Sequence, residues 1–586
     1  YGSWRNNYVS IADDPSSEKP GDKQMQYYQN RLTDRIVAQK PFINTKKILL
    51  DAYVQESSAG GKRYPKAREE IFAAFEKGAL VFNYIGHGGE DGLTEERIWE
   101  KSDGQNLNNR YKYPLFVTIT CDFSRFDNPY RPTAGEYTYW NPKGGAISMI
   151  TTIRSIGQGP AQYFNDILVE QVMSFGSDDY PSMAEALRLA KNVSPNSSTN
   201  VVFYLGDPAI KLAIPRPKVV LTKVNDVPIS QSIDDFKSLA YVKINGEVLD
   251  ENNNLLPTYN GEVAVNIFDK NITTSTLRND NVDAIINDAF DTAPTMPFVK
   301  LGETVFRGNA SVVNGKFEFG FVVPRDIRIP VDNGKISFYA KRNQLYLDKT
   351  GYNTDIKIGG INANAAIDNT GPRVKLYMND ETFVNGGITN KSPFLLAILE
   401  DENGINTASG IGHDIVGILD GDESNPYIMN DYYETELDDY TRGRVFFPYR
   451  NLEPGLHTIV FKAWDVYNNP VTAEIQFIVI GSDGVTLKNV LNYPNPFVNY
   501  TEFWFSHNRP FEPLEVQVQV MTITGKIVWT KNQTITTDGF LSREITWDGK
   551  DDFGDKIGKG VYVYKLTVKS TLTNKKSEKI EKLVIL

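Results

Sequence analysis

Apolar residues in the first third of the chain follow two spacings, one helical and one continuous. The helical spacing predicts helices over residues 24–39, 65–77, 160–172 and 183–191. Short apolar runs predict strands over residues 8–11, 47–53, 79–85, 115–120, 145–152 and 201–212. Strands that alternate with helices indicate a mostly parallel sheet with helices on both faces. We therefore expect an α/β domain over residues 1–213.

After Pro215 the apolar residues alternate with polar ones in short runs that turn residues separate. Runs such as 240–244 and 335–340 have the spacing of half-buried strands. Asn-Gly pairs at 245–246, 260–261 and 314–315 each predict a two-residue hairpin turn.

Two breaks divide this β region. One is the glycine-rich and polar stretch near 359–372, and the other is the short linker at 481–484. We therefore expect three immunoglobulin-like β-sandwich domains, over residues 214–362, 363–482 and 483–586.

The composition limits the function classes. The chain has 586 residues, of which 40% are hydrophobic and 23% are charged, an ordinary balance for globular domains. Its net charge is −11, whereas a protein that binds nucleic acid usually has an excess of positive charge on its surface. We therefore expect no nucleic-acid partner. The single cysteine, Cys121, excludes a framework of intrachain disulfides. No apolar run reaches the ~18 residues that a membrane-spanning helix requires.

Two residues with catalytic chemistry follow predicted buried strands. His87 lies among glycines after the strand at 79–85, and Cys121 follows the strand at 115–120. The carboxyl ends of parallel strands share one edge of a sheet, where active sites form. A thiol needs a nearby base or imidazolium to act as a nucleophile at neutral pH. We therefore predict His87 and Cys121 as a catalytic pair that needs no metal.

The backbone beside this pair offers donors for an oxyanion. The amides of Gly88 and Cys121 are the predicted oxyanion-hole donors, because glycines leave the backbone open to a substrate carbonyl. The alternative interpretation is a tight glycine loop beside an inert core thiol.

Four segments carry a resemblance to a known family. They are YIGHGG at 84–89, TITCDFSRF at 118–126, KGGAI at 143–147 and LGDPA at 205–209. These segments resemble the gingipain family of cysteine peptidases. The resemblance implies a caspase-like fold for the α/β domain and a cysteine peptidase or transpeptidase activity. It also implies that the chain begins partway through that domain, with an N-terminal part of the same protein as a partner.

Further stretches resemble the sortase branch of this family, which serves the type IX secretion system of Bacteroidetes. They are WRNN at 4–7, ADD at 12–14, GIN at 404–406, GIGHD at 410–414 and KAWDVYNN at 462–469. The resemblance implies a cell-surface protein that cleaves sorting domains from cargo and transfers the cargo to lipopolysaccharide. It also implies docking to an outer-membrane β-barrel of the PorV type.

The last β unit is similar to the C-terminal sorting domains that type IX cargo proteins carry. The similarity lies in LNYPNPF at 491–497, WDG at 547–549, GVYVY at 560–564 and KLVIL at 582–586. Docking could use the terminal apolar strand at 580–586 or the loop at 508–511. That strand could equally well close its own sandwich.

Other polar residues have open roles. Asp13, Asp14, Glu90 and Asp91 are candidates for a third catalytic carboxylate, although acidic loop residues are usually only solvated. His413, His457 and His507 are expected to be structural or incidental. No cofactor is expected to be required. The acidic turns at 401–403 and 548–555 are compatible with a structural calcium ion, although 548–555 lacks the closing Glu of an EF-hand.

Three function hypotheses remain open at this point. The leading one is a transpeptidase that holds cargo as a thioester on Cys121. The second is an endopeptidase that uses the same site with water as the acceptor. The third is a surface scaffold or adhesin with an inactive peptidase fold.

Overall fold

The structure, a computed structural model, describes residues 1–15, 20–343, 347–409, 412–479, 484–510, 512–537, 539–571 and 574–586. It forms two compact units, residues 1–365 and 366–586, each considered by itself. Three features named above lie partly outside the described residues: the stretch 410–411, the predicted domain boundary at 482–483, and position 511 of the predicted docking loop.

A six-stranded sheet is the centre of the α/β part of the first unit. Its strand order is β11-β10-β9-β5-β1-β2, and every neighbouring pair is parallel except β10 and β11. The strands are β1 (Asn7–Ala12), β2 (Asn44–Leu49), β5 (Val81–Ile85), β9 (Leu115–Ile119), β10 (Ser148–Thr152) and β11 (Val202–Leu205). The predicted mostly parallel sheet is confirmed. The predicted strands at 47–53 and 201–212 are shorter than expected, because 50–52 forms a 3-10 turn and β11 ends at Leu205.

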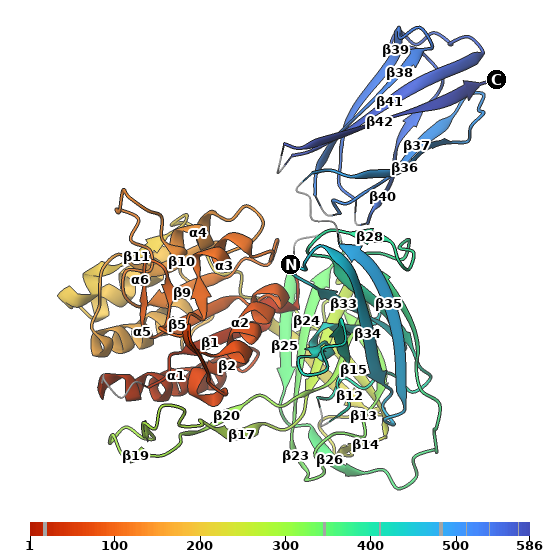
Figure 1. The fold of residues 1–586 in the computed structure, drawn as a ribbon. Coiled ribbons are helices and arrows are strands. Elements are labelled where there is room, and N and C mark those ends of the chain that lie inside the picture. Colours follow the sequence, from red (N-terminus) through yellow and green to blue (C-terminus); the bar gives the residue numbers. More distant parts are fainter. Residues whose placement is uncertain are drawn as a thin grey trace. The chain divides into compact units, whose positions relative to one another are not determined.

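Helices cover both faces of this sheet (Figure 1). One apolar core packs α1 (Met25–Gln39), α5 (Gln158–Val172) and α6 (Met183–Val193) against the sheet. The other packs α2 (Pro65–Lys77) and α4 (Ala134–Trp140) against the sheet, and α3 (Lys101–Asn106) lies beside α4. Local signals set the helix ends. α2 starts at Pro65 and stops before Gly78, which adopts a φ of 90° without strain because glycine lacks a β-carbon.

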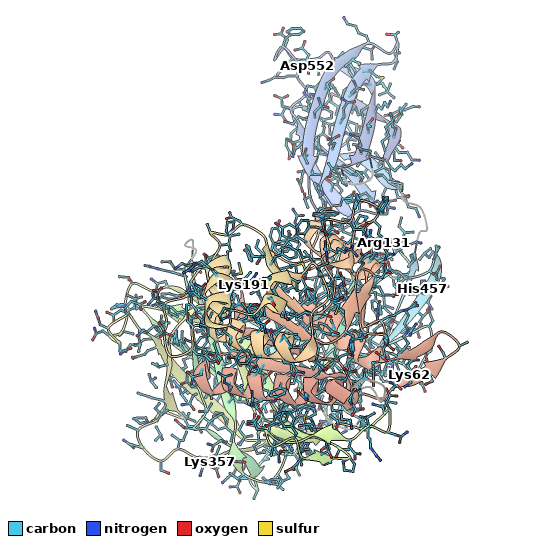
Figure 2. The ribbon with its side chains drawn as sticks, turned by 90° about the vertical axis from the view of Figure 1, so that its left-hand side faces the viewer. Lys62, Arg131, Lys191, Lys357, His457 and Asp552 are labelled. Atoms are coloured by element: carbon cyan, nitrogen blue, oxygen red, sulfur yellow. The ribbon has the colours of Figure 1, made fainter. Side chains whose placement is uncertain are left out.

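Short elements decorate the α/β part. They are the 3-10 turns η1 (Ser3–Asn6), η2 (Pro20–Gln24), η3 (Leu50–Ala52) and η4 (Ser197–Val201), the hairpin β3 (Glu56–Ser58) and β4 (Gly61–Arg63), and the small sheet β6 (Gly88–Gly89), β7 (Gly92–Leu93) and β8 (Trp99–Glu100). The β3–β4 hairpin carries Lys62 and projects from this part (Figure 2).

The rest of the first unit contains a sheet that closes on itself. Its strands are β13 (Val227–Pro228), β12 (Arg216–Val224), β15 (Tyr241–Val248), β22 (Lys316–Val322), β21 (Thr304–Val313), β16 (Gly261–Phe268), β24 (Lys335–Arg342) and β25 (Asp348–Asn353). β12 pairs with β15 on one side and with β25 on the other. The strands from β12 to β25 therefore form a closed ring, and this pairing does not confirm the β-sandwich predicted for 214–362. Periodicity predicts strands and their buried faces, but closure depends on a parallel pairing between segments 130 residues apart.

The predicted Asn-Gly hairpins have different outcomes. Asn314 and Gly315 connect β21 to β22 with φ angles of 51° and 78°, as the turn requires. Asn245 and Gly246 instead lie inside β15, so that prediction is wrong. A β-carbon on Gly246 would lie 2.1 Å from the Phe317 ring, so the glycine makes room for an aromatic ring from the neighbouring strand. At the third pair, Asn260 directly precedes β16 and Gly261 is its first residue, so the pair lies at the start of a strand.

The closed sheet sends out a long excursion between β16 and β21, called the arm below. It comprises residues 272–300, with β17 (Ile272–Ser275), β18 (Ala284–Ile285), β19 (Thr292–Ala293) and β20 (Pro297–Lys300). The arm runs away from the closed sheet and along the α/β part (Figure 1). A small three-stranded sheet of β14 (Phe236–Ser238), β26 (Lys357–Ile361) and β23 (Asp332–Asn333) completes the unit.

The second unit contains two pairs of packed sheets. The first pair is β27 (Arg373–Met378), β29 (Phe394–Glu400), β33 (Asp439–Pro448) and β32 (Tyr433–Glu436) against β28 (Ile388–Thr389), β35 (Pro470–Val479), β34 (Gly455–Trp464), β30 (Val416–Leu419) and β31 (Tyr427–Ile428). The second pair is β36 (Leu487–Tyr493), β37 (Thr501–His507) and β40 (Leu541–Trp547) against β39 (Ile527–Ile535), β38 (Leu514–Thr522), β41 (Gly560–Ser570) and β42 (Lys576–Ile585).

The terminal strand β42 belongs to its own sandwich. It pairs with β41 along its full length, and Leu583 and Ile585 lie in the apolar core. Among the described residues, its other edge has no neighbouring strand in the four-stranded sheet. Asn495 and Phe497 bond its last residues there, with a bridge between Phe497 and Ile585. Among the described residues of the chain, no helix has the length and apolarity that crossing a membrane requires.

Candidate active site

His87 and Cys121 follow the ends of two adjacent parallel strands. β5 and β9 pair with Ile85 opposite Ile119, and each candidate lies two residues beyond that pair. Both therefore lie at the carboxyl edge of the sheet and at the same level along it. Thr120 Oγ1 donates a hydrogen bond of 2.7 Å to the Gly86 carbonyl and ties the two strand ends together. The structure thus brings the predicted pair to one place.

A buried carboxylate orients the His87 ring. Asp22, in η2, is 2% exposed at its side chain, and its Oδ2 lies 3.0 Å from His87 Nε2. A carboxylate can only accept, so Nε2 carries a hydrogen and donates it. This tautomer leaves Nδ1 as the basic nitrogen of the neutral ring. The side chain of His87 is 34% exposed, so a substrate can reach it.

The backbone of the His87 segment is held by two side chains. Asp13, just after β1, accepts a hydrogen bond of 2.8 Å from the His87 N–H. The Tyr84 hydroxyl donates to the His87 carbonyl. These contacts set the position of His87 from the neighbouring strands, while Asp22 sets the direction of its ring.

Gly88 allows a close approach between the His87 segment and the strand that leads to Cys121. A β-carbon at Gly88 would lie 2.7 Å from Thr120 Oγ1 and 2.8 Å from Thr120 Cγ2. The adjacent Gly89 has open space at the same position, with nothing within 4 Å. Gly88 is therefore required by packing, and Gly89 is not.

The geometry of the β6–β7 hairpin suits Gly88 as an oxyanion donor. Gly88 pairs with Leu93, and the Thr94 N–H donates to the His87 carbonyl beside that pair. Such a pair lies between ladder hydrogen bonds, so the Gly88 N–H is directed away from β7. The amide of Cys121, at the end of the adjacent strand, remains the second predicted donor.

Cys121 lies at a sharp turn and is partly accessible. Its Sγ is 3.7 Å from the Ile156 carbonyl, to which a thiol donates weakly, and the residue is intermediate in exposure. The next residue, Asp122, has a φ of 52°, an unusual backbone conformation for a residue with a side chain. Ser155 donates a hydrogen bond of 2.9 Å to Asp122 and supports this turn. The turn exposes the thiol at the end of a buried strand.

The loops after the two catalytic candidates are joined by Glu90. Its carboxylate accepts hydrogen bonds from Arg131 at 2.8 Å, from Arg125 at 3.2 Å and from Asn128 at 3.1 Å. The side chain hydrogen bond from Arg131 is the largest cause that lowers the pKa of Glu90. Asp91 pairs with Lys101 at 2.8 Å. Glu90 and Asp91 thus bind cations of the loops, and neither contact involves His87.

Asp13 and Asp14 form a buried acidic cluster with Glu96. Oxygen atoms of the three carboxyl groups lie within 4.8 Å of one another, the spacing of a possible metal site. Burial and the neighbouring Asp14 raise the pKa of Asp13, and burial and Glu96 raise the pKa of Asp14 to about 7. The Tyr64 hydroxyl donates to Asp14 at 2.9 Å. Of these carboxyl groups, only Asp13 bonds His87, and it does so through the backbone.

A second acidic group lies in the other unit. Asp368, Asp401 and Asp465 place carboxylate oxygens within 4.8 Å of one another. Burial raises the pKa of Asp401 to about 6, with hydrogen bonds from the backbone opposing the shift. This group includes the acidic turn at 401–403, for which a structural calcium ion stays a prediction. Among the described residues, the turn at 548–555 forms no comparable group.

The remaining histidines have structural surroundings. His457 places Nδ1 2.7 Å from Asp420 and Nε2 2.6 Å from the Glu453 carbonyl. Burial lowers its pKa, but these two acceptors outweigh burial and raise it. His507 is buried, accepts from the Arg509 N–H, and its pKa is lowered by burial to about 4. His413 lies beside the Trp464 ring.

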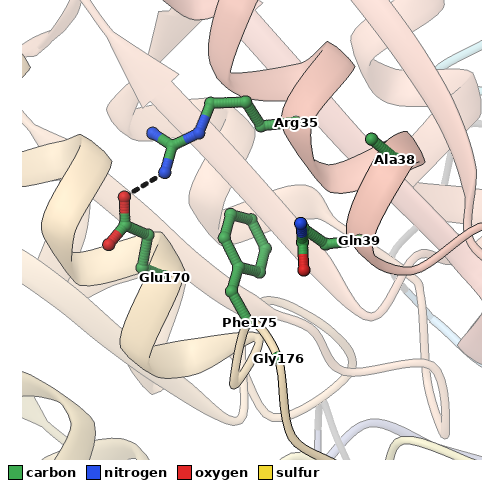
Figure 3. A pocket seen from close by; sticks show the side chains of 6 residues that line it. All are labelled: Arg35, Ala38, Gln39, Glu170, Phe175 and Gly176. Atoms are coloured by element: carbon green, nitrogen blue, oxygen red, sulfur yellow. Dashed lines mark hydrogen bonds and ion pairs between the residues drawn. The ribbon is translucent and has the colours of Figure 1, made fainter.

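A pocket of 330 Å³ lies away from these residues. It lies beside the carboxyl-terminal ends of α1 and α5, and its lining includes Arg35, Glu170 and Phe175 (Figure 3). Arg35 and Glu170 form an ion pair across it. Both helices run back from the carboxyl edge of the sheet, so this pocket lies toward the opposite edge and is separate from the His87–Cys121 site.

Comparison with known proteins gives a family match for the α/β part. Residues 1–213 match the family model described as Peptidase family C25. This segment is therefore similar to peptidase family C25 along its whole length. The match supports a peptidase of the cysteine type, and His87 and Cys121 both lie inside the matched segment. A comparison with curated proteins gave no match.

Solved structures were also found for the C25 segment and its neighbouring domains. The crystal structure of dimeric latent PorU from Porphyromonas gingivalis is 27% identical, covers 76% of this chain and 41% of that chain, and has a TM-score of 0.30. The Arg-specific cysteine proteinase gingipain R is 13% identical, covers 61% of this chain and 67% of that chain, and has a TM-score of 0.31. This chain therefore spans less than half of the PorU chain.

Asp22 is the functional candidate that the sequence did not indicate. It follows β1, whose end lies beside β5, so its segment reaches the same edge of the sheet as His87. The rule that placed His87 and Cys121 at the edge applies equally to the segment after β1. Asp13 and Asp14 directly follow the strand, whereas Asp22 lies eight residues beyond Asp14.

Proposed function

We propose that this chain is a cysteine transpeptidase of the gingipain type that acts as the cell-surface sortase of a type IX secretion system. Its reaction is the cleavage of a C-terminal sorting domain from secreted cargo and the transfer of that cargo to surface lipopolysaccharide. One observation carries the proposal: His87 and Cys121 end adjacent parallel strands at matching positions within a peptidase family C25 segment. The specific role as a sortase rests on the resemblance of the sequence motifs.

The first half of the reaction forms a thioester. The Cys121 thiol loses its proton to His87 Nδ1, and Sγ attacks the carbonyl carbon that precedes the sorting domain. The carbonyl oxygen takes the negative charge, and the amides of Gly88 and Cys121 donate to it. His87 returns the proton to the departing amine of the sorting domain as the carbon–nitrogen bond breaks. Asp22 stabilises the imidazolium that exists between these two proton transfers.

The second half of the reaction resolves the thioester. An amine of the lipopolysaccharide attacks the same carbonyl carbon while His87 Nδ1 accepts its proton. The carbon–sulfur bond then breaks, the thiolate of Cys121 leaves, and a new amide joins the cargo to the acceptor. The proton returns from His87 to the thiol. With water in place of the amine the same steps give hydrolysis, so an endopeptidase is the second candidate function.

The localisation and partners belong to the same proposal. A sortase of this type works at the outer face of the outer membrane, and its last domain docks to an outer-membrane β-barrel of the PorV type. The likeness of 491–497, 547–549 and 560–564 to cargo sorting domains supports this assignment. Because β42 is paired with β41 and contributes Leu583 to the core, docking by this domain would use its outer edge or loops.

The test uses the complete protein with a cargo protein that ends in a sorting domain and a small primary amine as the acceptor. Mass spectrometry separates cargo that carries the amine from cargo with a free carboxylate. We expect the amine adduct with the wild type and neither product with Cys121→Ala. Free carboxylate alone at saturating amine would assign an endopeptidase. Equal cleavage by Cys121→Ala would contradict the proposed nucleophile, and no cleavage by either protein would favour the scaffold hypothesis.

A further inference from the structure

The arm at 272–300 is part of the hydrophobic core of the α/β part, although it belongs to the closed sheet in sequence. Ala284, Met296 and Phe298 are 7%, 2% and 5% exposed and lie in the same apolar cluster as Leu32 and Ile36 of α1. These arm residues are more than 240 positions from the helix that they help to bury. The arm is therefore an integral layer of the α/β part.

Polar contacts anchor the arm along this path. The Asp51 carboxylate accepts from the backbone amides of Arg278 and Asn279 at 3.0 and 2.8 Å. Lys47, whose side chain is 2% exposed, donates to the Val299 carbonyl at 2.7 Å. These contacts bind the backbone of the arm, which fixes its course more firmly than exposed side-chain pairs do.

The far part of the arm reaches the segment that orients His87. β18, which contains Ala284, packs beside η2. Asp288, a few residues further along the arm, pairs with Arg31 of α1, the helix that directly follows η2. η2 carries Asp22, whose carboxylate bonds the His87 ring at 3.0 Å. The chain of contacts therefore runs from the arm through η2 to the catalytic candidate.

A short 3-10 turn cannot hold a buried carboxylate in place by itself. η2 has 5 residues, and 3-10 geometry gives weaker hydrogen bonds than an α-helix. Its position therefore depends on the elements packed against it, and among the described residues the main ones are α1, α5 and β18. Of these three, only β18 comes from outside the C25 segment.

We infer that the arm of the closed sheet is a positioning element of the active site, with β18, the strand that contains Ala284, holding η2 so that Asp22 stays bonded to His87. Ala284 is a positioning residue that acts through Asp22 and touches no reacting atom. The inference rests on the proposed function only in taking Cys121 and His87 as the reacting pair. It assigns a catalytic dependence to residues outside the peptidase segment itself.

The experiment measures the second-order rate of Cys121 alkylation by iodoacetamide across pH in the full-length chain. Ala284→Leu inserts bulk between β18 and the core beside η2, and Ala289→Leu makes the same change at an exposed position of the same arm. Ala284→Val is a milder variant in case the leucine prevents folding. Asp22→Asn and the double variant Asp22→Asn with Ala284→Leu complete the set, and thermal unfolding is recorded for each.

We expect Ala284→Leu to slow alkylation by about tenfold, since a displacement of about 1 Å can cost up to a hundredfold. Its pH–rate profile should move in the same direction as that of Asp22→Asn, and Ala289→Leu should retain the wild-type profile. The double variant should be no slower than Asp22→Asn alone, because both changes act through one contact.

Two results would overturn the inference: a rate for the folded Ala284 variants within twofold of wild type, or a full additional loss from Ala284→Leu in the Asp22→Asn background. Failure of the proposed function is a separate outcome. In that case wild-type Cys121 would react no faster in the folded chain than in the denatured chain, whatever the arm does.

Discussion

Gly88→Ala tests the close approach between the His87 segment and β9. The new methyl group would lie 2.7 Å from Thr120 Oγ1 and 2.8 Å from Thr120 Cγ2. Ordinary contact begins near 3.4 Å, so the segment or the threonine must move by about 0.7 Å. Thr120 cannot yield freely, because its hydroxyl bonds the Gly86 carbonyl at 2.7 Å. The displacement is therefore expected to fall on the segment that carries His87.

The size of the effect follows from this displacement. Overpacking by one methyl group costs about 1–3 kcal/mol of stability. A misplacement approaching 1 Å at a reacting group costs up to about 100-fold in rate. We therefore expect Gly88→Ala to lose about 10- to 100-fold in the rate of Cys121 alkylation or cargo cleavage, and to unfold at a lower temperature.

The control is the same substitution one residue later. Gly89→Ala places its methyl group in open space, so both its rate and its unfolding temperature should match the wild type. A second comparison adds Thr120→Ala to Gly88→Ala, which removes both clashing atoms and should restore part of the rate relative to Thr120→Ala alone. Equal activity of Gly88→Ala and Gly89→Ala, within twofold, would refute the close approach as a requirement of the site.

Three further outcomes are expected. Glu90→Gln should slow cargo cleavage several-fold while Cys121 stays intact. The substitution removes the negative charge that binds Arg131 and joins the loops after His87 and Cys121. An unchanged kcat/KM would refute this. Asp14→Asn should flatten the pH dependence of unfolding between pH ~4 and ~7. The folded chain binds more protons there than the unfolded chain, so stability falls as pH rises. His507 acts in the opposite direction, since burial lowers its pKa to about 4. The unfolded chain takes up the proton first, so stability falls as pH drops from ~6.5 to ~4, and His507→Gln should remove that slope in thermal unfolding, whereas an unchanged slope would contradict it.

Local patterns in the sequence predicted the elements that form the α/β part. The helix at Pro65–Lys77 begins and ends where its proline and Gly78 predict, because these residues act through their own backbone geometry. The buried strands that lead to His87 and Cys121 were predictable for the same reason: a run of apolar residues identifies a strand inside a parallel sheet. The common edge of the two residues then follows from the parallel direction of neighbouring strands.

Tertiary structure alone decided the features that depend on distant segments. The pair Asn245–Gly246 has the local signal of a turn, but pairing with β12 and β22 and the Phe317 ring over Gly246 keep it in a strand. Asp22 became the partner of the His87 ring because η2 packs between α1, α5 and an arm that begins 250 residues later. A short-range pattern carries the conformational preference of a few residues. Ring closure, the arm and the partner of His87 depend on the sum of many weak contacts between segments that the pattern does not relate to one another.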